Sequence, residues 1–155
     1  MPHQYRIEKQ RLAVSLRLLG GRCVEGEMFV PRTAEGYAPV ARAIDVFNAD
    51  EPFLPLELAD GGVVLVAKDR VVEVMGEGVG EDDELRLSIA LRSPLELILN
   101  GGAVLEGWML LEVPDDRQRV LDFLNDYRQR FLTFYTLEGP RLVNARLIEL
   151  SRPLD

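Results

Sequence analysis

The chain has 155 residues, of which 47% are apolar and 28% are charged, and its formal net charge is −8. This balance is typical of a globular protein with enough apolar residues for a core. The negative charge disfavours general nucleic-acid binding, because such binding draws most of its affinity from neutralising phosphates. No apolar run reaches the roughly 18 residues of a membrane-spanning helix, so we expect no membrane insertion.

The N-terminal segment and the cysteine content indicate a cytoplasmic protein. Residues 1–12 are mostly polar and lack the apolar stretch of a secretory signal. Cys23 is the only cysteine, which excludes an internal disulfide and favours a reducing compartment. Because Cys23 follows a turn at the start of an apolar strand, we expect its side chain to be buried.

The first predicted unit covers residues 12–75 and begins with a hairpin. Residues 14–19, VSLRLL, alternate apolar and polar positions, as half-buried strands do. The Gly20–Gly21 pair favours a tight turn, and CVEGEMFV at 23–30 is the expected return strand. Gly26, inside that strand, predicts a sharp bend or bulge.

A short helix and three more strands complete the first unit. Val40, Ile44 and Phe47 have the spacing of one apolar helical face. We expect the helix to end near Asn48, because asparagine tolerates the left-handed conformation common at helix ends. Apolar, valine-rich runs predict the remaining strands at 53–58, 63–67 and 70–74.

Residues 76–84, GEGVGEDDE, separate this unit from the rest of the chain. The segment contains three glycines and five acidic residues, so it has little to bury and its charges repel one another. We expect a linker or exposed loop. The spacing of calcium ligands in an EF-hand is absent, so no metal site is predicted there.

The second predicted unit, residues 85–153, repeats the features of the first in the same order. Glu-Gly occurs at 25–26 and again at 106–107, and RAIDVFNA at 42–49 is matched by RVLDFLND at 119–126. The closing segments 65–74 and 142–150 also match, with one residue deleted. This shared order predicts an internal duplication.

The predicted fold class is α+β, mainly β. We expect two tandem, pseudo-twofold-related units, each a small curled antiparallel sheet or barrel of four to five strands with one short helix. A unit of this size buries only about 60% of its unfolded surface and is marginal alone. The two units are therefore expected to pack together like a homodimer fused into one chain.

Residues 106–150, EGWMLLEVPDDRQRVLDFLNDYRQRFLTFYTLEGPRLVNARLIEL, resemble an uncharacterised bacterial domain family. Its pattern is a strand ending in a glycine step, a polar turn, Arg-x-x-Asp-x-Leu-Asn, then Phe-(Leu/Ile) and a closing strand pair. The first half matches more loosely, since Phe47 replaces the leucine and the turn before the helix is longer. The pattern is also loosely similar to small Sm-like or SH3-like barrels. The resemblance implies a fold and a repeat, and carries no known activity.

The Arg-x-x-Asp-x-x-Asn motif occurs twice, once in each predicted helix. Its members are Arg42, Asp45, Asn48, Arg119, Asp122 and Asn125. Residues three apart on a helix are neighbours, so each arginine can pair with its aspartate, while each asparagine lies at a helix end. We interpret the motif as structural. The alternative is that the two arginines line a ligand or partner site.

The residue inventory excludes several chemistries. One histidine and one cysteine cannot form a tetrahedral Cys/His zinc shell. Neither a Walker loop nor a GxGxxG motif is present. No acid–base pair with an evident partner stands out among the carboxylates. We therefore predict no enzyme activity, no catalytic residues, no cofactor and no metal.

The predicted function is a non-enzymatic, cytoplasmic protein-interaction or regulatory module that acts on a protein partner or forms a homo-oligomer. The candidate interaction surface lies in the second unit, which is rich in aromatic residues. Its members are Trp108, Phe123, Tyr127, Phe134 and Tyr135. Exposed edge strands offer a second contact mode, by strand addition.

Two alternatives come from other functional classes. A small-ligand sensor would have a pocket between the repeats, with Arg42 and Arg119 near the pseudo-axis. An Sm-like RNA binder would show salt-sensitive binding, which the net charge disfavours.

Overall fold

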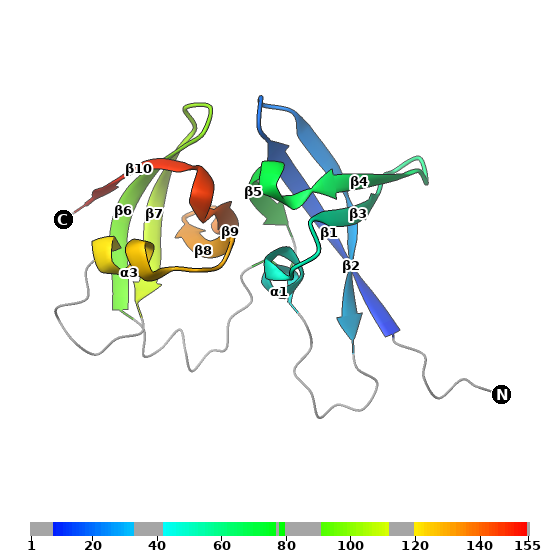
Figure 1. Cartoon of the computed structure of the whole chain (residues 1–155), viewed down its shortest axis with the longest axis horizontal. Helices are drawn as coiled ribbons and strands as arrows, with labels where there is room; N and C mark the ends of the chain where they lie inside the picture. The colour runs from blue at the N-terminus through cyan, green and yellow to red at the C-terminus, as the bar shows by residue number, and fades with distance from the viewer. Residues whose placement is uncertain (1–7, 33–41, 77, 80–90, 112–119, 155) are drawn as a thin grey trace.

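A computed structural model of the chain describes residues 8–32, 42–76, 78–79, 91–111 and 120–154. These residues form one ten-stranded antiparallel sheet, with two short α-helices and two 3₁₀ turns. The prediction of a mainly β protein is confirmed. We call β1–β5 with α1 the N-terminal half, and β6–β10 with α3 the C-terminal half (Figure 1).

The elements follow one another in the same sequence in both halves. The N-terminal half contains β1 (Glu8–Leu18), β2 (Cys23–Arg32), α1 (Ala43–Asn48), β3 (Phe53–Glu57), β4 (Val63–Ala67), the 3₁₀ turn η2 (Lys68–Arg70) and β5 (Val71–Gly76). The C-terminal half contains β6 (Leu91–Leu99), β7 (Val104–Leu111), α3 (Val120–Asp126), β8 (Phe131–Thr136), β9 (Gly139–Asn144), the 3₁₀ turn η3 (Ala145–Leu147) and β10 (Ile148–Pro153). The predicted strands overlap these elements, but Leu19, Leu58 and Arg70, each predicted at the end of a strand, lie one residue outside β1, β3 and β5.

Strand order within the sheet is also the same in both halves. The N-terminal half runs β5-β1-β2-β3-β4 and the C-terminal half runs β10-β6-β7-β8-β9. In each half the last strand pairs with the first through a register shift, at Arg17/Leu18 in one and at Ile148/Leu150 in the other. The closing segments therefore align without the deletion that the sequence comparison assumed, and Val71 corresponds to Ile148.

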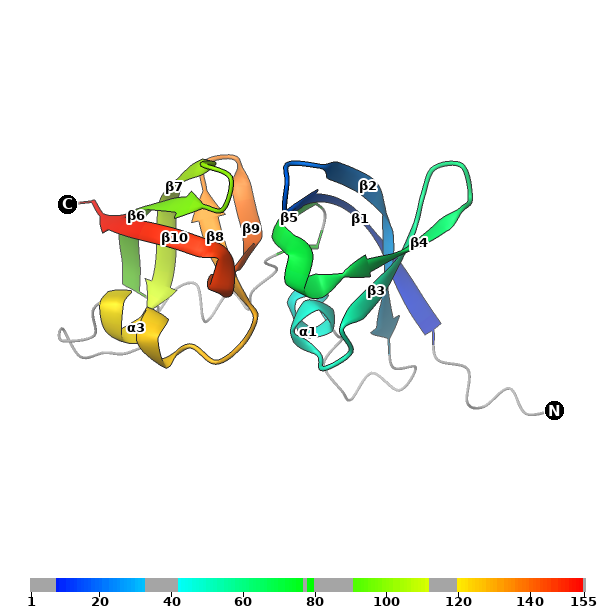
Figure 2. The same cartoon turned by 45° about the horizontal axis from the view of Figure 1, so that its top comes forward.

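The halves are joined by unlike strands. β5, the fifth strand of the N-terminal half, pairs with β9, the fourth strand of the C-terminal half. A twofold-related interface would also contain the reciprocal pair, β4 with β10, but these are the two outermost strands of the sheet. The predicted pseudo-twofold arrangement is therefore wrong, and the halves are arranged head to tail. α1 and α3 accordingly lie at the same end of their halves (Figure 2).

Glycine pairs form the hairpin turns, as the sequence predicts. Gly20 and Gly21 have φ angles of 88° and 93°, and Gly101 and Gly102 have 91° and 84°. Side chains other than glycine are strained in this region, which explains why both turns use the same pair.

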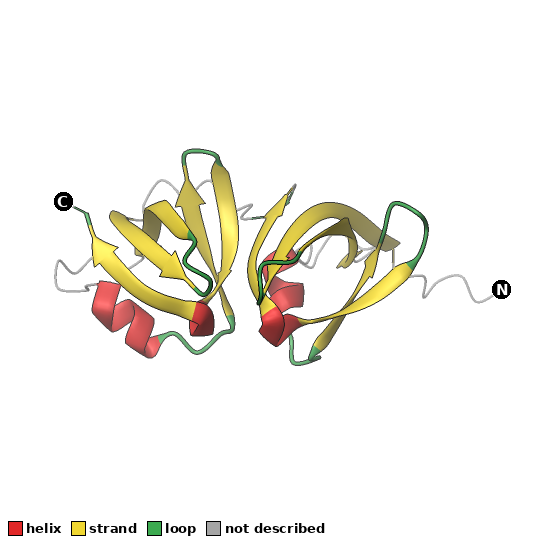
Figure 3. Cartoon of the chain, turned by 90° about the horizontal axis from the view of Figure 1, so that it is seen from above, coloured by secondary structure: helices red, strands yellow, loops and turns green. Residues whose placement is uncertain are grey.

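The interior glycines lie where the sheet bends most sharply. β2 meets β3 through the single residue pair Glu27–Glu57, and β7 meets β8 through Trp108–Tyr135 alone. A Cβ atom on Gly107 would lie 1.9 Å from the carbonyl oxygen of Tyr135. On Gly26 it would lie 2.6 Å from the carbonyl oxygen of Glu57. Only glycine permits this approach, and the curved strands that result are visible in Figure 3.

The helices end close to the predicted residues but for another reason. α1 ends at Asn48, and Ala49 after it is extended, with φ −66° and ψ 159°. Among the described residues only glycines have positive φ, so the expected left-handed asparagine is wrong. Val40, predicted to begin the apolar stripe, lies outside the described residues.

Two apolar clusters form the core, and each contains residues from both halves. The N-terminal cluster includes Phe131 and Leu142 from the C-terminal half. The C-terminal cluster includes Val72 from β5. Val79, in the segment predicted as a linker, is also buried in the N-terminal cluster, while residues 77 and 80–84 of that segment lie outside the described ranges. The halves therefore share their packing and are not merely tethered.

Candidate functional site

Each half has a groove at the bend where its interior glycine lies. The N-terminal groove has a volume of about 540 Å³ and is lined by residues on both sides of Gly26. The C-terminal groove has a volume of about 600 Å³ and is lined by residues on both sides of Gly107. Since both lie beside the single residue pair that connects neighbouring strands, they occupy equivalent positions in the two halves.

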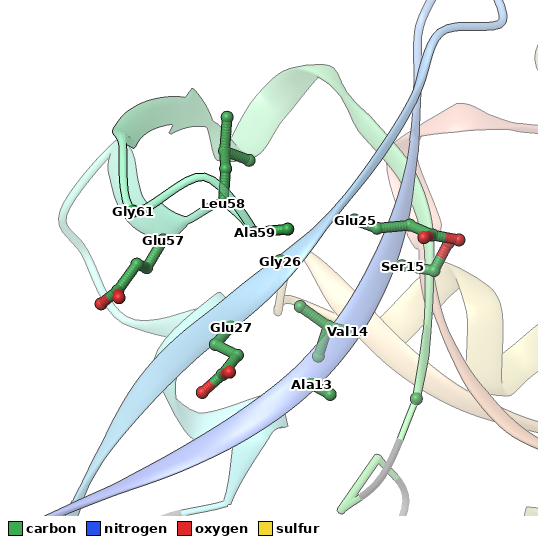
Figure 4. A pocket seen from close by; sticks show the side chains of 11 residues that line it. Ala13, Val14, Ser15, Glu25, Gly26, Glu27, Glu57, Leu58, Ala59 and Gly61 are labelled. Atoms are coloured by element: carbon green, nitrogen blue, oxygen red, sulfur yellow. The ribbon is translucent and has the colours of Figure 1, made fainter.

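The N-terminal groove has small side chains on its floor and carboxylates around it. Glu27 and Glu57 lie on the same side of the groove, as Figure 4 shows. Arg11 lies 3.9 Å from the Glu27 carboxylate and 3.6 Å from that of Glu57, between exposed or half-buried side chains. Ala13 and Ala59 supply little apolar area. Val14 and Leu58 also line it, so this groove is partly apolar, but none of its lining residues is aromatic.

The C-terminal groove has an aromatic side chain, Trp108, in its lining. Trp108 stacks on Tyr135 with ring centroids 6.1 Å apart and planes inclined by 13°. The Arg92 guanidinium lies over the indole, 5.1 Å from its centre. Apolar side chains complete much of the lining, namely Pro94, Val104, Leu105, Leu137 and Leu154. This surface combines the Trp108–Tyr135 stack with exposed aliphatic groups, and tryptophan and tyrosine are among the residues most enriched in binding hot spots.

Charged groups border the C-terminal groove. Arg141 pairs with Glu138 at 3.0 Å and lies 3.5 Å from Glu73. Glu106 contributes an exposed carboxylate to the lining. The lining therefore carries two carboxylates and one guanidinium, and the Arg92 guanidinium lies beside it over Trp108.

The structure separates the five aromatic residues predicted to form an interaction surface. Trp108 lines the C-terminal groove, whereas Tyr135, which stacks on it, lines the small cavity between the halves, as Phe123 and Tyr127 do. Phe123 and Tyr127 stack on each other, with centroids 5.3 Å apart, and pack against the C-terminal cluster. Phe134 is fully buried in that cluster and is a core residue rather than part of a surface.

The repeated Arg-x-x-Asp-x-x-Asn motif has a structural role in the N-terminal half. The Arg42 guanidinium lies 3.8 Å from the Asp45 carboxylate, and the backbone N–H of Arg42 donates to that carboxylate at 2.8 Å. Asn48 hydrogen-bonds the backbone of Phe131 in both directions, accepting from its N–H at 2.7 Å and donating to its carbonyl at 3.0 Å. The motif thus connects the two halves.

The second copy of the motif is only partly described. Arg119 lies outside the described residues, and Asp122 and Asn125 are both exposed on α3. The carbonyl of Asn125 accepts from the Arg128 guanidinium at 2.9 Å. Whether Arg42 and Arg119 line one site therefore stays a prediction.

Sequence reasoning missed a set of buried polar residues between the halves. Glu73 is buried and bonds Arg17 at 3.2 Å on one side and Arg141 on the other. The side chain of Asn144 donates to the carbonyl of Val71 at 3.0 Å. These residues look like ordinary strand positions, because their partners are more than fifty residues away.

Lys68 is a further buried cation that sequence reasoning missed. Its ammonium donates to the carbonyls of Val46 and Ala49, at 2.7 and 3.4 Å, at the end of α1. Burial lowers the pKa of Lys68 below its usual 10.5, because desolvation penalises the charged form. In the sequence, only the scarcity of lysine distinguishes Lys68 from exposed charged residues.

Cys23, expected to be buried, is instead exposed at the edge of its turn.

The described part of the chain contains no group of three or more histidine, cysteine or acidic side chains placed to hold a metal ion. It also contains no helix with the length and apolarity needed to cross a membrane.

Comparison with known proteins gives no match: no family model, no curated protein and no solved structure is similar to this chain. Its function must therefore be inferred from its own residues.

Proposed function

We propose that the protein is a non-enzymatic, cytoplasmic interaction module whose C-terminal groove binds an extended segment of a partner protein. The observation that carries the proposal is the Trp108–Tyr135 stack beside an apolar groove of about 600 Å³. Tryptophan and tyrosine supply large contact areas at low conformational cost, and they dominate the energetics of protein interfaces.

The composition of the groove indicates the kind of segment it binds. Its aliphatic lining suits apolar side chains of the partner, while Glu106 and the acidic chain as a whole favour a neighbouring basic residue. A groove between neighbouring strands suits an extended peptide better than a bulky domain. The partner is therefore an apolar segment with at least one lysine or arginine.

Two further observations favour this proposal over a ligand sensor and an RNA binder. One hollow lined by both halves, beside Met75 and Arg141, has a volume of about 430 Å³, but its lining does not include Arg42, which the sensor alternative requires. The cavity that Arg42 does line, with Ile44 and Phe123, has a volume of only about 70 Å³. Metabolite pockets are larger, on the order of 300–1,000 Å³. Carboxylates at both grooves and a net charge of −8 disfavour contact with phosphates.

The proposal includes a duplicated origin for the chain, each half being one copy of a small curled unit of the family that it resembles. The common strand order, the common register shift and the two glycine approaches support it. A duplication leaves one copy free to keep the fold while the other acquires a binding groove, in keeping with aromatic residues in only one of the two grooves.

Selection from a random peptide library tests the proposal. Peptides that bind the immobilised protein are expected to be apolar with a basic residue. Trp108 is the only tryptophan of the chain, so a shift of its fluorescence on titration reports occupancy of the groove directly. Trp108→Ala is expected to weaken binding by about 2 kcal/mol or more in calorimetry.

Glu27→Ala supplies the matched control, because Glu27 occupies the position of Trp108 in the N-terminal half. It is expected to leave peptide affinity unchanged. Selected peptides that bind Trp108→Ala as tightly as the original protein, or failure to select any peptide, would overturn the proposal.

A further inference from the structure

The interface between the halves uses one side of each half. On the N-terminal half it is formed by β5 and α1, and on the C-terminal half by β8 and β9. Glu73 and Val74 of β5 pair with Val143 and Leu142 of β9. The Phe47 ring of α1 meets the Phe131 ring of β8 edge to face, with centroids 5.1 Å apart.

At the two ends of the molecule, no other described strand pairs with the equivalent elements. The α3/β10 face, formed by α3 and β10, corresponds to α1 and β5. The β3/β4 face, formed by β3 and β4, corresponds to β8 and β9. β10 and β4 are the two outermost strands of the sheet, and they lie on opposite sides of the interface (Figures 1 and 2).

Equivalent apolar residues differ in burial in the way that a missing partner predicts. Phe131 is fully buried, whereas Phe53, at the same position in β3, is 54% exposed. Leu142 is fully buried, whereas Leu65, at the same position in β4, is 69% exposed. Each exposed residue lacks the neighbour that β5 and α1 supply inside the chain.

A hollow on the β3/β4 face matches a side chain on the α3/β10 face. In the C-terminal half, Ile44 and Arg42 of α1 fill the surface beside Leu132 and leave about 70 Å³. The equivalent hollow of the N-terminal half, beside Leu54, keeps about 340 Å³. The counterpart of Ile44 is Leu121 of α3, which is 64% exposed.

The three charged residues of the internal interface have apolar counterparts on the two outer faces. Inside the chain, Glu73 is held between Arg17 and Arg141. Strand pairing shows that Leu150 is equivalent to Glu73 and Ile98 to Arg17. In the same way, Val64 is equivalent to Arg141. Contact between β10 and β4 of two chains would therefore bring leucine, isoleucine and valine together in place of an ion triad.

The free edge of β4 lacks the protection that edge strands usually have. Its five residues, Val63–Ala67, include no charge and no proline, and Val63, Val64 and Leu65 are exposed. Isolated edges are commonly blocked by charge or proline, because unpaired backbone groups otherwise add strands from other molecules.

We infer that the α3/β10 face of one chain binds the β3/β4 face of a second copy, and so repeats between chains the interface that joins the halves. Leu150 and Ser151 of β10 then pair with Val66 and Leu65 of the neighbour's β4. The contact is heterologous, so each chain binds one copy at each end, and the assembly is a closed ring or a filament.

Two variants test the inference on exposed positions that the monomer does not need for its core. Leu121→Asp removes the α3/β10 contact and keeps the β3/β4 face, while Leu65→Lys does the opposite. Sedimentation is expected to show assemblies for the original protein and, for each variant alone, only the 17.5 kDa chain. An equal mixture of the two is expected to form dimers of twice that mass and nothing larger, because only one intact contact remains per pair.

Other results would overturn the inference. Original protein that stays monomeric at high concentration excludes the contact. A symmetric contact between two β4 strands would instead leave Leu121→Asp dimeric and would give no mixed dimer. Far-ultraviolet circular dichroism of both variants verifies that the fold is kept, and Leu150→Asp serves as a second variant of the α3/β10 face.

One position allows a test by gain of affinity. Glu149 stands on β10 where Val72, buried at the interface between the halves, stands on β5. Glu149→Val is expected to tighten self-association at least tenfold, measured by sedimentation equilibrium. Unchanged or weaker association in this variant would contradict the equivalence of the two interfaces.

Discussion

Phe131 and Phe53 begin the same strand in their respective halves, and both are followed by leucine. One packs against Phe47 of α1 and is completely buried; the other is more than half exposed. The local sequence is therefore the same while the environment differs. The burial of such equivalent residues therefore depends on whether the other half lies next to them along the sheet, rather than on the sequence pattern within their own half.

The largest expected effect comes from truncating this pair of residues. Phe131→Ala leaves a cavity between both halves and is expected to lower the free energy of unfolding by about 3–5 kcal/mol. Phe53→Ala removes a half-exposed ring and is expected to cost the isolated chain well under ~1.5 kcal/mol. Urea denaturation at low protein concentration compares the two directly. Equal losses would show that the rings have similar surroundings, contrary to the structure.

The ion triad between the halves provides the next test. Glu73→Gln leaves Arg17 and Arg141 without their carboxylate and is expected to cost about 3 kcal/mol. Replacing the triad by the residues at the equivalent positions, as Glu73→Leu with Arg17→Ile and Arg141→Val, removes all three charges together.

The free energy of unfolding of the triple variant is expected to lie within about 1 kcal/mol of that of the original protein, or above it, since apolar groups can replace a buried ion pair. Arg17 already has one buried guanidinium nitrogen, Nη2, without a hydrogen-bond partner among the described residues, which favours its replacement. A triple variant less stable than Glu73→Gln would show that the two interfaces are not interchangeable.

The smallest expected effect concerns Lys68, whose counterpart in the C-terminal half is Ala145. Burial is the main cause of its lowered pKa; Arg130 adds to it, while Glu51 and Asp50 oppose it. Between the lowered pKa and 10.5 the unfolded chain binds more protons than the folded one. The contribution of Lys68 to stability is thus expected to rise with pH across that window.

Comparison with Lys68→Met isolates this contribution. The difference in free energy of unfolding between the original protein and the variant is expected to grow in favour of the original as pH rises towards 10.5. Parallel pH profiles for the two proteins would show that Lys68 titrates normally in the folded state.

Local patterns in the sequence account for most of the secondary structure. The alternation at 14–19, the glycine pairs and the helical spacing of Ile44 and Phe47 each depend on neighbours within a few residues, so a short stretch of sequence is enough to predict them. The bends at Gly26 and Gly107 were also predictable, because an interior glycine in an apolar strand indicates a close backbone approach.

The roles of individual side chains were less predictable. Asn48 looked like a helix-end residue, and its actual partner is the backbone of Phe131. Phe134 and Trp108 are both aromatic strand residues, yet one is in the core and the other lines a groove. Which face of a strand becomes the core follows from the sheet's curvature, which a single segment does not contain.

The sequence by itself determined the repeated order of elements and the mainly β character. It also showed that the chain lacks the cysteines and histidines that a Cys/His zinc site or an internal disulfide needs. Only the tertiary structure decided that the halves join head to tail, with β5 against β9, and that two unlike edges are left uncovered. The physical reason is that strand pairing uses backbone groups common to every residue. The choice between edges therefore depends on side chains such as Glu73, Arg141 and Phe131, which are far from their partners in the sequence and meet them only in the tertiary structure.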